Sequence, residues 1–110
     1  MDKRITDEDV EKAVDYLRDT AEEAAKYKAE RIYLDEFRKS LKALIMKKHL
    51  DLPVSAQERE AYASQEYQNH LLSIKFAIEK DEKQRFLRVA AEAKIEAWRS
   101  MSANIRSIKI

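Results

Sequence analysis

The sequence predicts an all-α protein, a long antiparallel helical hairpin of the coiled-coil type that oligomerisation completes into a helix bundle. Three observations predict it. The 110 residues contain no glycine and one proline, so the positive-φ positions of tight β-hairpins are missing. Apolar residues recur at alternating steps of three and four, as on one face of a helix. Pro53 marks the one plausible interruption, because proline cannot continue a helix.

A first helix is expected from about residue 7 to residue 49. Thr6 and Asp9 match a variant of the capping box, and the acidic first turn meets the positive end of the helix dipole. Two heptad-like seams follow, the first of Val10, Val14, Leu17, Ala21 and Ala24, the second of Leu34, Phe37, Leu41, Leu44 and Lys48. They are out of phase by three residues, which predicts a kink or a change of supercoil near residues 26–31.

The turn is expected at residues 50–55, and a second helix from about 56 to 107. Ser55 and Glu58 match a capping box at its start. No glycine or proline follows, so we expect one continuous helix, with 79–85 as the stretch where it could bend. Its apolar positions are Tyr67, Leu71, Ile74 and Ile78, then Leu87, Ala91, Ile95, Trp98, Met101, Ile105 and Ile108. The whole chain, residues 1–110, then makes a single helical domain.

The short connection should fold the two helices antiparallel about residue 52. Net charge supports this register, because it alternates −5, +5, −4 and +5 over residues 1–36, 37–50, 51–82 and 83–110. Folding at Pro53 therefore lays opposite charges together, with bases of 83–94 beside the acidic start and bases of 38–48 beside Glu58, Glu60 and Glu66. The pairs expected to face each other are Leu34 with Leu71, Leu17 with Leu87 and Val10 with Ile95.

The apolar surface exceeds what a lone hairpin can bury, since each helix of a pair covers only one face. A second copy of the chain is the simplest second layer, so we expect a homo-oligomer, most readily a dimer. In the register above, residues 96–110 have no intrachain helix beside them. The contacts expected to bind a second copy or an unidentified protein partner are Trp98, Met101, Ile105 and Ile108.

No catalytic, cofactor or metal site stands out, so a non-enzymatic protein without a cofactor is expected. The chain has no cysteine and no glycine-rich phosphate loop. Glu66 and His70 stand one turn apart but have no third ligand, and Ser73 follows His70 by one turn. Both patterns are typical of a solvated helix face. A non-enzymatic module for oligomerisation and protein interaction is the function that these features favour.

Two basic clusters keep nucleic-acid binding as the alternative. Arg38, Lys39, Lys42, Lys47 and Lys48 gather at the predicted hairpin tip, and Arg99 stands next to Trp98. Arginine and tryptophan together can stack on bases. Lysines are also favoured at the C-terminal end of any helix by its dipole, and the net charge of +1 does not point to a polyanion. Survival of binding at high salt distinguishes a protein partner from phosphate contacts.

The expected location is the cytoplasm, without a membrane partner. The longest apolar run, Ala43 to Met46, falls far short of the roughly 20 residues that span a bilayer. The N-terminal residues lack the apolar core of a secretory signal.

Three stretches resemble a group of small uncharacterised α-helical accessory proteins of tailed bacteriophages and prophages. They are RKSLKALIMKKH (38–49), AQEREAYAS (56–64) and FLRVAAEAKIEAWRS (86–100). The resemblance covers residues 38–100 and is most distinctive after Pro53 and around Trp98 and Arg99. It implies an accessory protein of phage DNA replication or recombination in the host cytoplasm, and it brings no catalytic motif. The acidic first 35 residues lie outside it.

Overall fold

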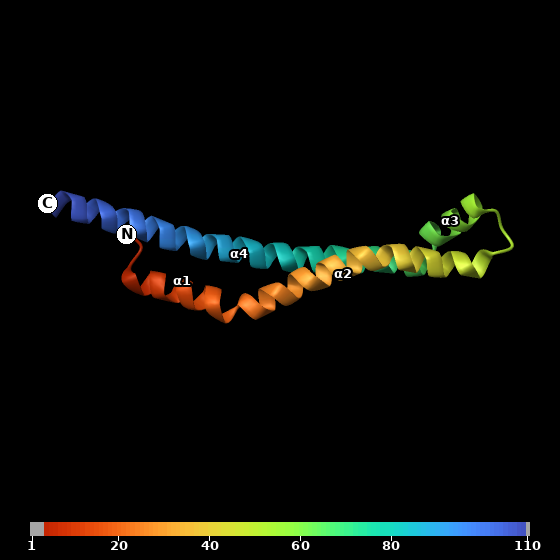
Figure 1. The fold of residues 1–110 in the computed structure, drawn as a ribbon, viewed down its shortest axis with the longest axis horizontal. Helices are drawn as coiled ribbons and strands as arrows, with labels where there is room; N and C mark the ends of the chain where they lie inside the picture. Colours follow the sequence, from red (N-terminus) through yellow and green to blue (C-terminus); the bar gives the residue numbers. More distant parts are fainter. Residues whose placement is uncertain (1–3, 110) are drawn as a thin grey trace. The chain divides into compact units, whose positions relative to one another are not determined.

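A computed structural model describes residues 4–109, and within them the chain is helical without a strand (Figure 1). The elements are α1 (Asp7–Asp19), α2 (Ala21–Met46), the 3-10 turn η1 (Lys47–His49), α3 (Val54–Ala63) and α4 (Gln65–Lys109). The prediction of an all-α, hairpin-like fold is confirmed. The chain forms two units, one of residues 1–25 with 82–110 and one of residues 26–81. In each unit a segment of α4 lies beside an earlier helix.

The start of α1 is capped as the sequence predicts. The Thr6 hydroxyl accepts a hydrogen bond from the Asp9 backbone N–H at 3.1 Å, and the Asp9 carboxylate accepts one from the Thr6 N–H at 3.0 Å. Hydrogen bonding of the Asp9 carboxyl to the Thr6 backbone N–H, and then to the Thr6 side chain, lowers the pKa of that carboxyl from its ordinary value. The capping box therefore depends on an ionised Asp9.

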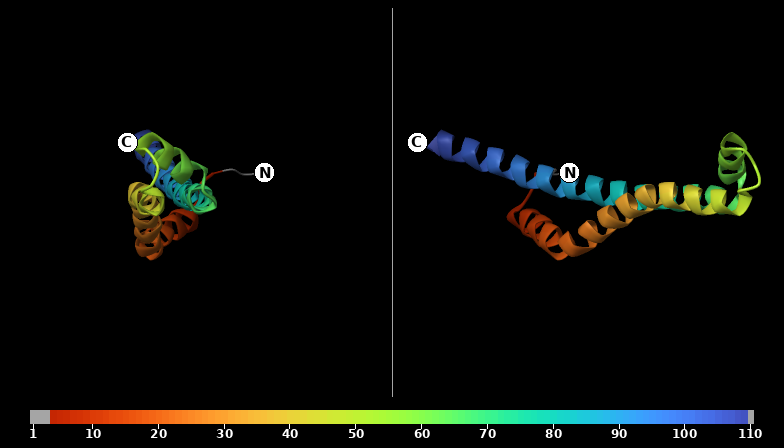
Figure 2. Two further views of the ribbon diagram at one scale, coloured as in Figure 1. Left: turned by 90° about the vertical axis from the view of Figure 1, so that its right-hand side faces the viewer. Right: turned by 45° about the vertical axis from the view of Figure 1, so that its right-hand side comes forward.

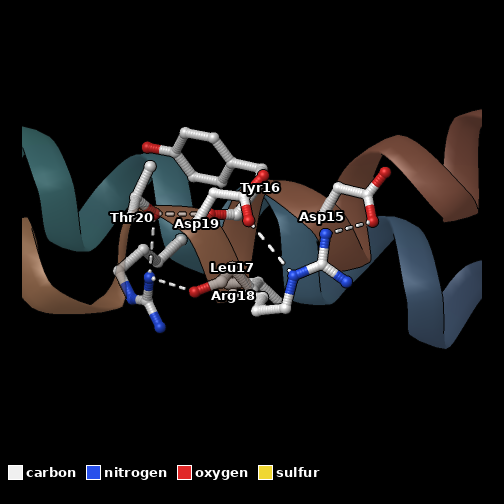
Figure 3. Close-up of polar contacts among 7 residues, drawn as sticks. Asp15, Tyr16, Leu17, Arg18, Asp19 and Thr20 are labelled. Atoms are coloured by element: carbon white, nitrogen blue, oxygen red, sulfur yellow. Dashed lines mark hydrogen bonds and ion pairs between the residues drawn. The ribbon is translucent and has the colours of Figure 1, made fainter.

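The first helix breaks at Thr20, so the prediction of one helix over 7–49 with a kink near 26–31 is wrong in position. The Thr20 hydroxyl donates to the Tyr16 carbonyl oxygen at 2.6 Å, in competition with the backbone N–H that bonds the same oxygen at 3.0 Å. Arg88 of α4 donates to the Leu17 carbonyl at 3.0 Å and to the Thr20 hydroxyl at 3.0 Å (Figure 3). A side chain from another helix thus binds a carbonyl left free at the end of α1.

The buried face of α4 is a seam of positions spaced three and four apart. Every member is buried or half-buried: Tyr67, His70, Ile74, Ala77 and Asp81 in the unit of residues 26–81, and Gln84, Arg88, Ala91, Ile95, Trp98 and Ser102 in the other unit. Leu71, Ile78 and Leu87, which the apolar pattern assigns to this face, flank it with 36%, 37% and 43% of their surface exposed. The predicted seam is therefore wrong by one residue at these positions, because polar residues occupy the face.

Four of these polar seam residues, His70, Asp81, Gln84 and Arg88, have a partner on the facing helix. His70 Nε2 lies 2.7 Å from the Leu34 carbonyl oxygen. Asp81 binds Arg31 at 3.0 Å, and Gln84 accepts from the Tyr16 hydroxyl at 3.2 Å. The predicted register is thus correct to within one residue, since Leu34 bonds His70 next to Leu71 and Leu17 bonds Arg88 next to Leu87.

The turn at Pro53 is confirmed, but the helix after it starts earlier than predicted. The Pro53 carbonyl accepts from the Gln57 N–H at 2.9 Å, so α3 begins at Val54. Ser55 lies inside the helix, and no side chain caps its start. The capping box assigned to Ser55 and Glu58 is therefore wrong. Gln57 instead donates to the Leu52 carbonyl at 2.8 Å and ties α3 to the turn.

The second helix is divided at Ser64, whereas the sequence predicts one helix over 56–107. Ser64 has an extended backbone, and its hydroxyl accepts from the Tyr67 N–H at 3.2 Å, as an N-cap of α4 does. The stretch 79–85 is helical without a break.

Residues 41–67 contain the buried apolar cluster of their unit. Ile45, Ala61 and Tyr67 are buried together, with Leu41 and Met46 packed against them. The right-hand view of Figure 2 shows α3 at the end of the unit where α2 stops and α4 starts. The separate helix α3 therefore covers the hairpin end, which explains why Ala61 is completely buried.

Replacing Asp9 with Asn should remove an acid-dependent part of the stability of α1. The pKa of Asp9 is lowered in the folded chain, so its carboxylate stabilises the fold above the unfolded pKa of about 3.9, and this contribution is lost as the pH falls through the folded pKa. The wild-type thermal midpoint should exceed that of the variant at neutral pH, and the difference should close in acid. Circular dichroism melts over a pH series measure this, with Glu11→Gln, exposed on the same helix, as control. A difference independent of pH would contradict the prediction.

Replacing Arg88 with Met should lower the free energy of unfolding by about 1–3 kcal/mol, because the half-buried groups that Arg88 binds lose their partner. Urea denaturation measures the loss. Arg85→Met is the matched control. Arg85 is 59% exposed and pairs only locally, with Glu82, so its replacement should cost about 0.5 kcal/mol at most. Equal losses for both variants would show that Arg88 does not hold the end of α1.

Candidate interaction surfaces

Trp98 has a partner within its own chain. Its indole N–H donates to the Asp7 carboxylate at 2.8 Å, and the side chain is half-buried on the α4 seam. The expectation that no intrachain helix lies beside residues 96–110 is therefore wrong at Trp98, because the first turn of α1 reaches it. The expected contact of Trp98 with a second protein remains a prediction.

The other three residues of the predicted contact differ in exposure. Met101 is half-buried, Ile105 is 50% exposed and Ile108 is 85% exposed. Both isoleucines lie near the C-terminal end of α4. Exposure of large apolar side chains to water is unfavourable. Of the predicted contact residues, Ile105 and Ile108 therefore present the most open apolar surface.

Most of the basic residues singled out for nucleic acid already face a carboxylate. The pairs are Arg38 with Asp35 at 3.7 Å, Lys39 with Glu36 at 3.6 Å, Lys42 with Glu58 at 3.6 Å, Lys48 with Glu66 at 2.9 Å, and Arg99 with Glu96 at 3.2 Å. Lys47 is exposed. The predicted approach of the tip bases is confirmed for Glu58 and Glu66, whereas Glu60 is exposed. The clusters are thus locally close to neutral, which weakens their attraction for phosphate.

Lys42 is the most constrained of these cations. Its Nζ lies 4.7 Å from the centre of the Tyr62 ring, and only 27% of its side chain is exposed. Tyr62 in turn packs edge-on against Tyr67 at 5.2 Å. Hydrogen bonding to Tyr62 and the charge of Glu58 raise the pKa of Lys42. Lys42 therefore contributes to the packing of α3 on α2 through Tyr62 and Glu58.

The polar groups weighed for catalysis or metal binding are engaged elsewhere. His70 bonds the Leu34 carbonyl and lies against the Phe37 ring at 5.7 Å, while Glu66 pairs with Lys48. The Ser73 hydroxyl bonds the Asn69 carbonyl at 3.3 Å. Within residues 4–109 no three carboxylate or imidazole groups are grouped to hold a metal ion. His70 and Ser73 thus bond different carbonyl groups and form no nucleophile and base pair here.

Exposed apolar side chains mark surfaces that sequence reasoning did not locate. In the unit of residues 26–81 they include Ile32 at 52%, Leu72 at 52% and Phe76 at 56% exposed. In the other unit, Phe86 and Val89 are 60% and 50% exposed on α4. The signal in the sequence was the surplus of aromatic and aliphatic residues, which predicted a second layer but not its place.

Among the described residues, no helix combines the length and the apolar character that crossing a membrane requires.

The chain matches no protein-family model, no curated protein and no solved structure closely enough to establish a relationship. The role of these surfaces is therefore inferred from the exposure, charge and contacts of their own residues.

Replacing both Ile105 and Ile108 with Ser should weaken self-association or partner binding and leave the unfolding free energy of the dilute chain nearly unchanged. Both side chains are exposed, so little intrachain packing is lost. Trp98→Phe should instead cost about 0.5–1.5 kcal/mol of stability, because the bond to Asp7 is lost. Sedimentation and urea denaturation separate the two effects. Unfolding of the double Ser variant, or full stability of Trp98→Phe, would contradict these assignments.

Proposed function

We propose that this chain is a non-enzymatic helical module that associates with itself and with another protein. The balance of buried and exposed apolar side chains supports this most directly. Among the described residues, three large apolar side chains are buried, Ile45, Tyr67 and Ile74, whereas sixteen are at least 36% exposed. Covering such side chains is worth about 1.5–3 kcal/mol each at full burial. A second protein layer is the simplest cover.

The small size of the core supports the same proposal. Four of the seven buried apolar residues are alanines, namely Ala13, Ala61, Ala77 and Ala91. Helical pairs with cores of this size rarely reach the stability of a larger domain by themselves, and natural ones often gain it by oligomerisation. Self-association would therefore supply stability as well as a binding function.

The pairing of the basic residues places protein association ahead of nucleic-acid binding. Contact with phosphate would have to compete with Asp35, Glu36, Glu58 and Glu66 for the same cations. Association through exposed apolar side chains does not have to compete with such ion pairs. Nucleic-acid binding is accordingly the alternative function, to be distinguished by experiment from protein association.

The resemblance of residues 38–100 to phage accessory proteins gives the proposal a setting. We place the module in the cytoplasm of a bacterial host, as an accessory of phage DNA replication or recombination that works by holding proteins together. The proposal assigns it no reaction, in keeping with the engagement of His70, Glu66 and Ser73 in other contacts.

Sedimentation equilibrium at micromolar concentration tests the proposal. We expect a mass above that of the 12.9 kDa chain, most readily a dimer, which persists in high salt because apolar burial drives it. A labelled oligonucleotide is added in a parallel series. A strictly monomeric and thermally stable chain would contradict self-association. A monomer that binds the oligonucleotide with steep loss of affinity in salt would favour the nucleic-acid alternative.

A further inference from the structure

The unit of residues 26–81 carries a groove of about 510 Å³ between α2 and α4. Ile32, Ile74 and Ile78 form its apolar part, and Ile32 and Ile78 are 52% and 37% exposed. Lys28 and Glu36 of α2 also line it. The other charged residues of the lining pair within the chain, Arg31 with Asp81 at 3.0 Å and Asp35 with Arg38 at 3.7 Å. Beyond these pairs, Lys28 and Glu36 give the groove one charge of each sign on the same helix.

The spacing of these charges is symmetric about the exposed isoleucine. Lys28 precedes Ile32 by four residues and Glu36 follows it by four, so the three side chains lie along one row of the helix surface. Glu36 makes an ion pair with Lys39 at 3.6 Å, in which both side chains are largely exposed. Such a pair is weak and exchangeable, so Glu36 can serve a second partner.

A row of this kind is complementary to itself when two copies run antiparallel. A two-fold axis at Ile32 brings Ile32 against its own copy, and it sets Lys28 of each chain opposite Glu36 of the other. A parallel arrangement would instead set Lys28 on Lys28 and Glu36 on Glu36. Rows of residues four apart are also the ridges that pack most often between helices, and two-fold dimers are the commonest oligomers.

We propose that this groove is a self-association face, occupied by α2 of a second copy that runs antiparallel about a two-fold axis at Ile32. The inference rests on the proposed self-association and names its face and orientation. Burial of Ile32 against its own copy and against Ile78 supplies affinity. The Lys28 and Glu36 contacts, each made twice, select the antiparallel orientation over the parallel one.

Charge reversal in the full-length chain tests the inference by sedimentation equilibrium at low salt. Lys28→Glu alone and Glu36→Lys alone each turn two attractive contacts into repulsive ones, so each should weaken self-association by about tenfold or more. The double variant, with both reversals, should regain it. An equimolar mixture of the two single variants should form a one-to-one complex, because each then presents the charge that the other lacks.

The matched controls reverse charges on the opposite side of the same helix pair. Glu30 and Lys80 line the other groove, with Tyr27 and Phe76, so Glu30→Lys and Lys80→Glu should leave association unchanged. All substituted side chains are exposed, and circular dichroism checks that helicity is kept. Ile32→Ser should weaken association by about tenfold or more without any change of charge.

The outcomes separate this inference from the proposed function. If the wild type associates but the single variants associate equally well, or if the controls alone lose association, the face is wrong and the proposed function stands. If the double variant and the mixture fail to recover association, the antiparallel two-fold arrangement is overturned. A wild type that is monomeric at all concentrations overturns both proposals.

Discussion

The pairing of α4 with the earlier helices depends on polar residues in its seam. His70, Asp81, Gln84 and Arg88 stand where a coiled coil usually places apolar side chains, and each binds a group on the facing helix of its own unit. A half-buried polar group without its partner costs more than the bond itself contributes. These contacts therefore select one register, because sliding α4 by a turn would leave several such groups unpaired. Arg88 contributes most to this selection of register, since it also binds the Thr20 hydroxyl at the end of α1.

Because polar residues occupy several positions of the α4 seam, this seam buries little apolar surface. Alanines supply much of the core, while Phe76, Phe86 and Ile32 remain largely exposed on other faces of the same helices. The polar seam therefore has two effects. It makes the pairing of helices within the chain specific, and it leaves apolar surface exposed for a second chain. The proposed antiparallel contact at Ile32 would return part of the missing burial, and its flanking charges would give that contact an orientation.

The charged residues pair mainly with opposite charges of the same chain. A composition with 39% charged residues and a net charge of +1 allows almost every cluster to find opposite charge nearby. Lys42 and Lys48 hold α3 and the start of α4 to the end of α2 through Glu58 and Glu66. Exposed pairs of this kind contribute little stability individually. Their larger effect is to neutralise the surface on which a nucleic acid would have to dock, which is why protein association is the stronger proposal.

The sequence by itself determined the helical class, the turn at Pro53, the Thr6 and Asp9 cap and the pairing of helices to within one residue. Each follows from local rules, since proline, cap residues and short connections act on their neighbours. Only the tertiary structure decided the break at Thr20, the polar seam and the bond from Trp98 to Asp7. These depend on partners between 36 and 91 residues away, such as Arg88 for Leu17 and Asp7 for Trp98. Apolar periodicity cannot register them, because a polar residue enters a seam only when a specific distant group satisfies it.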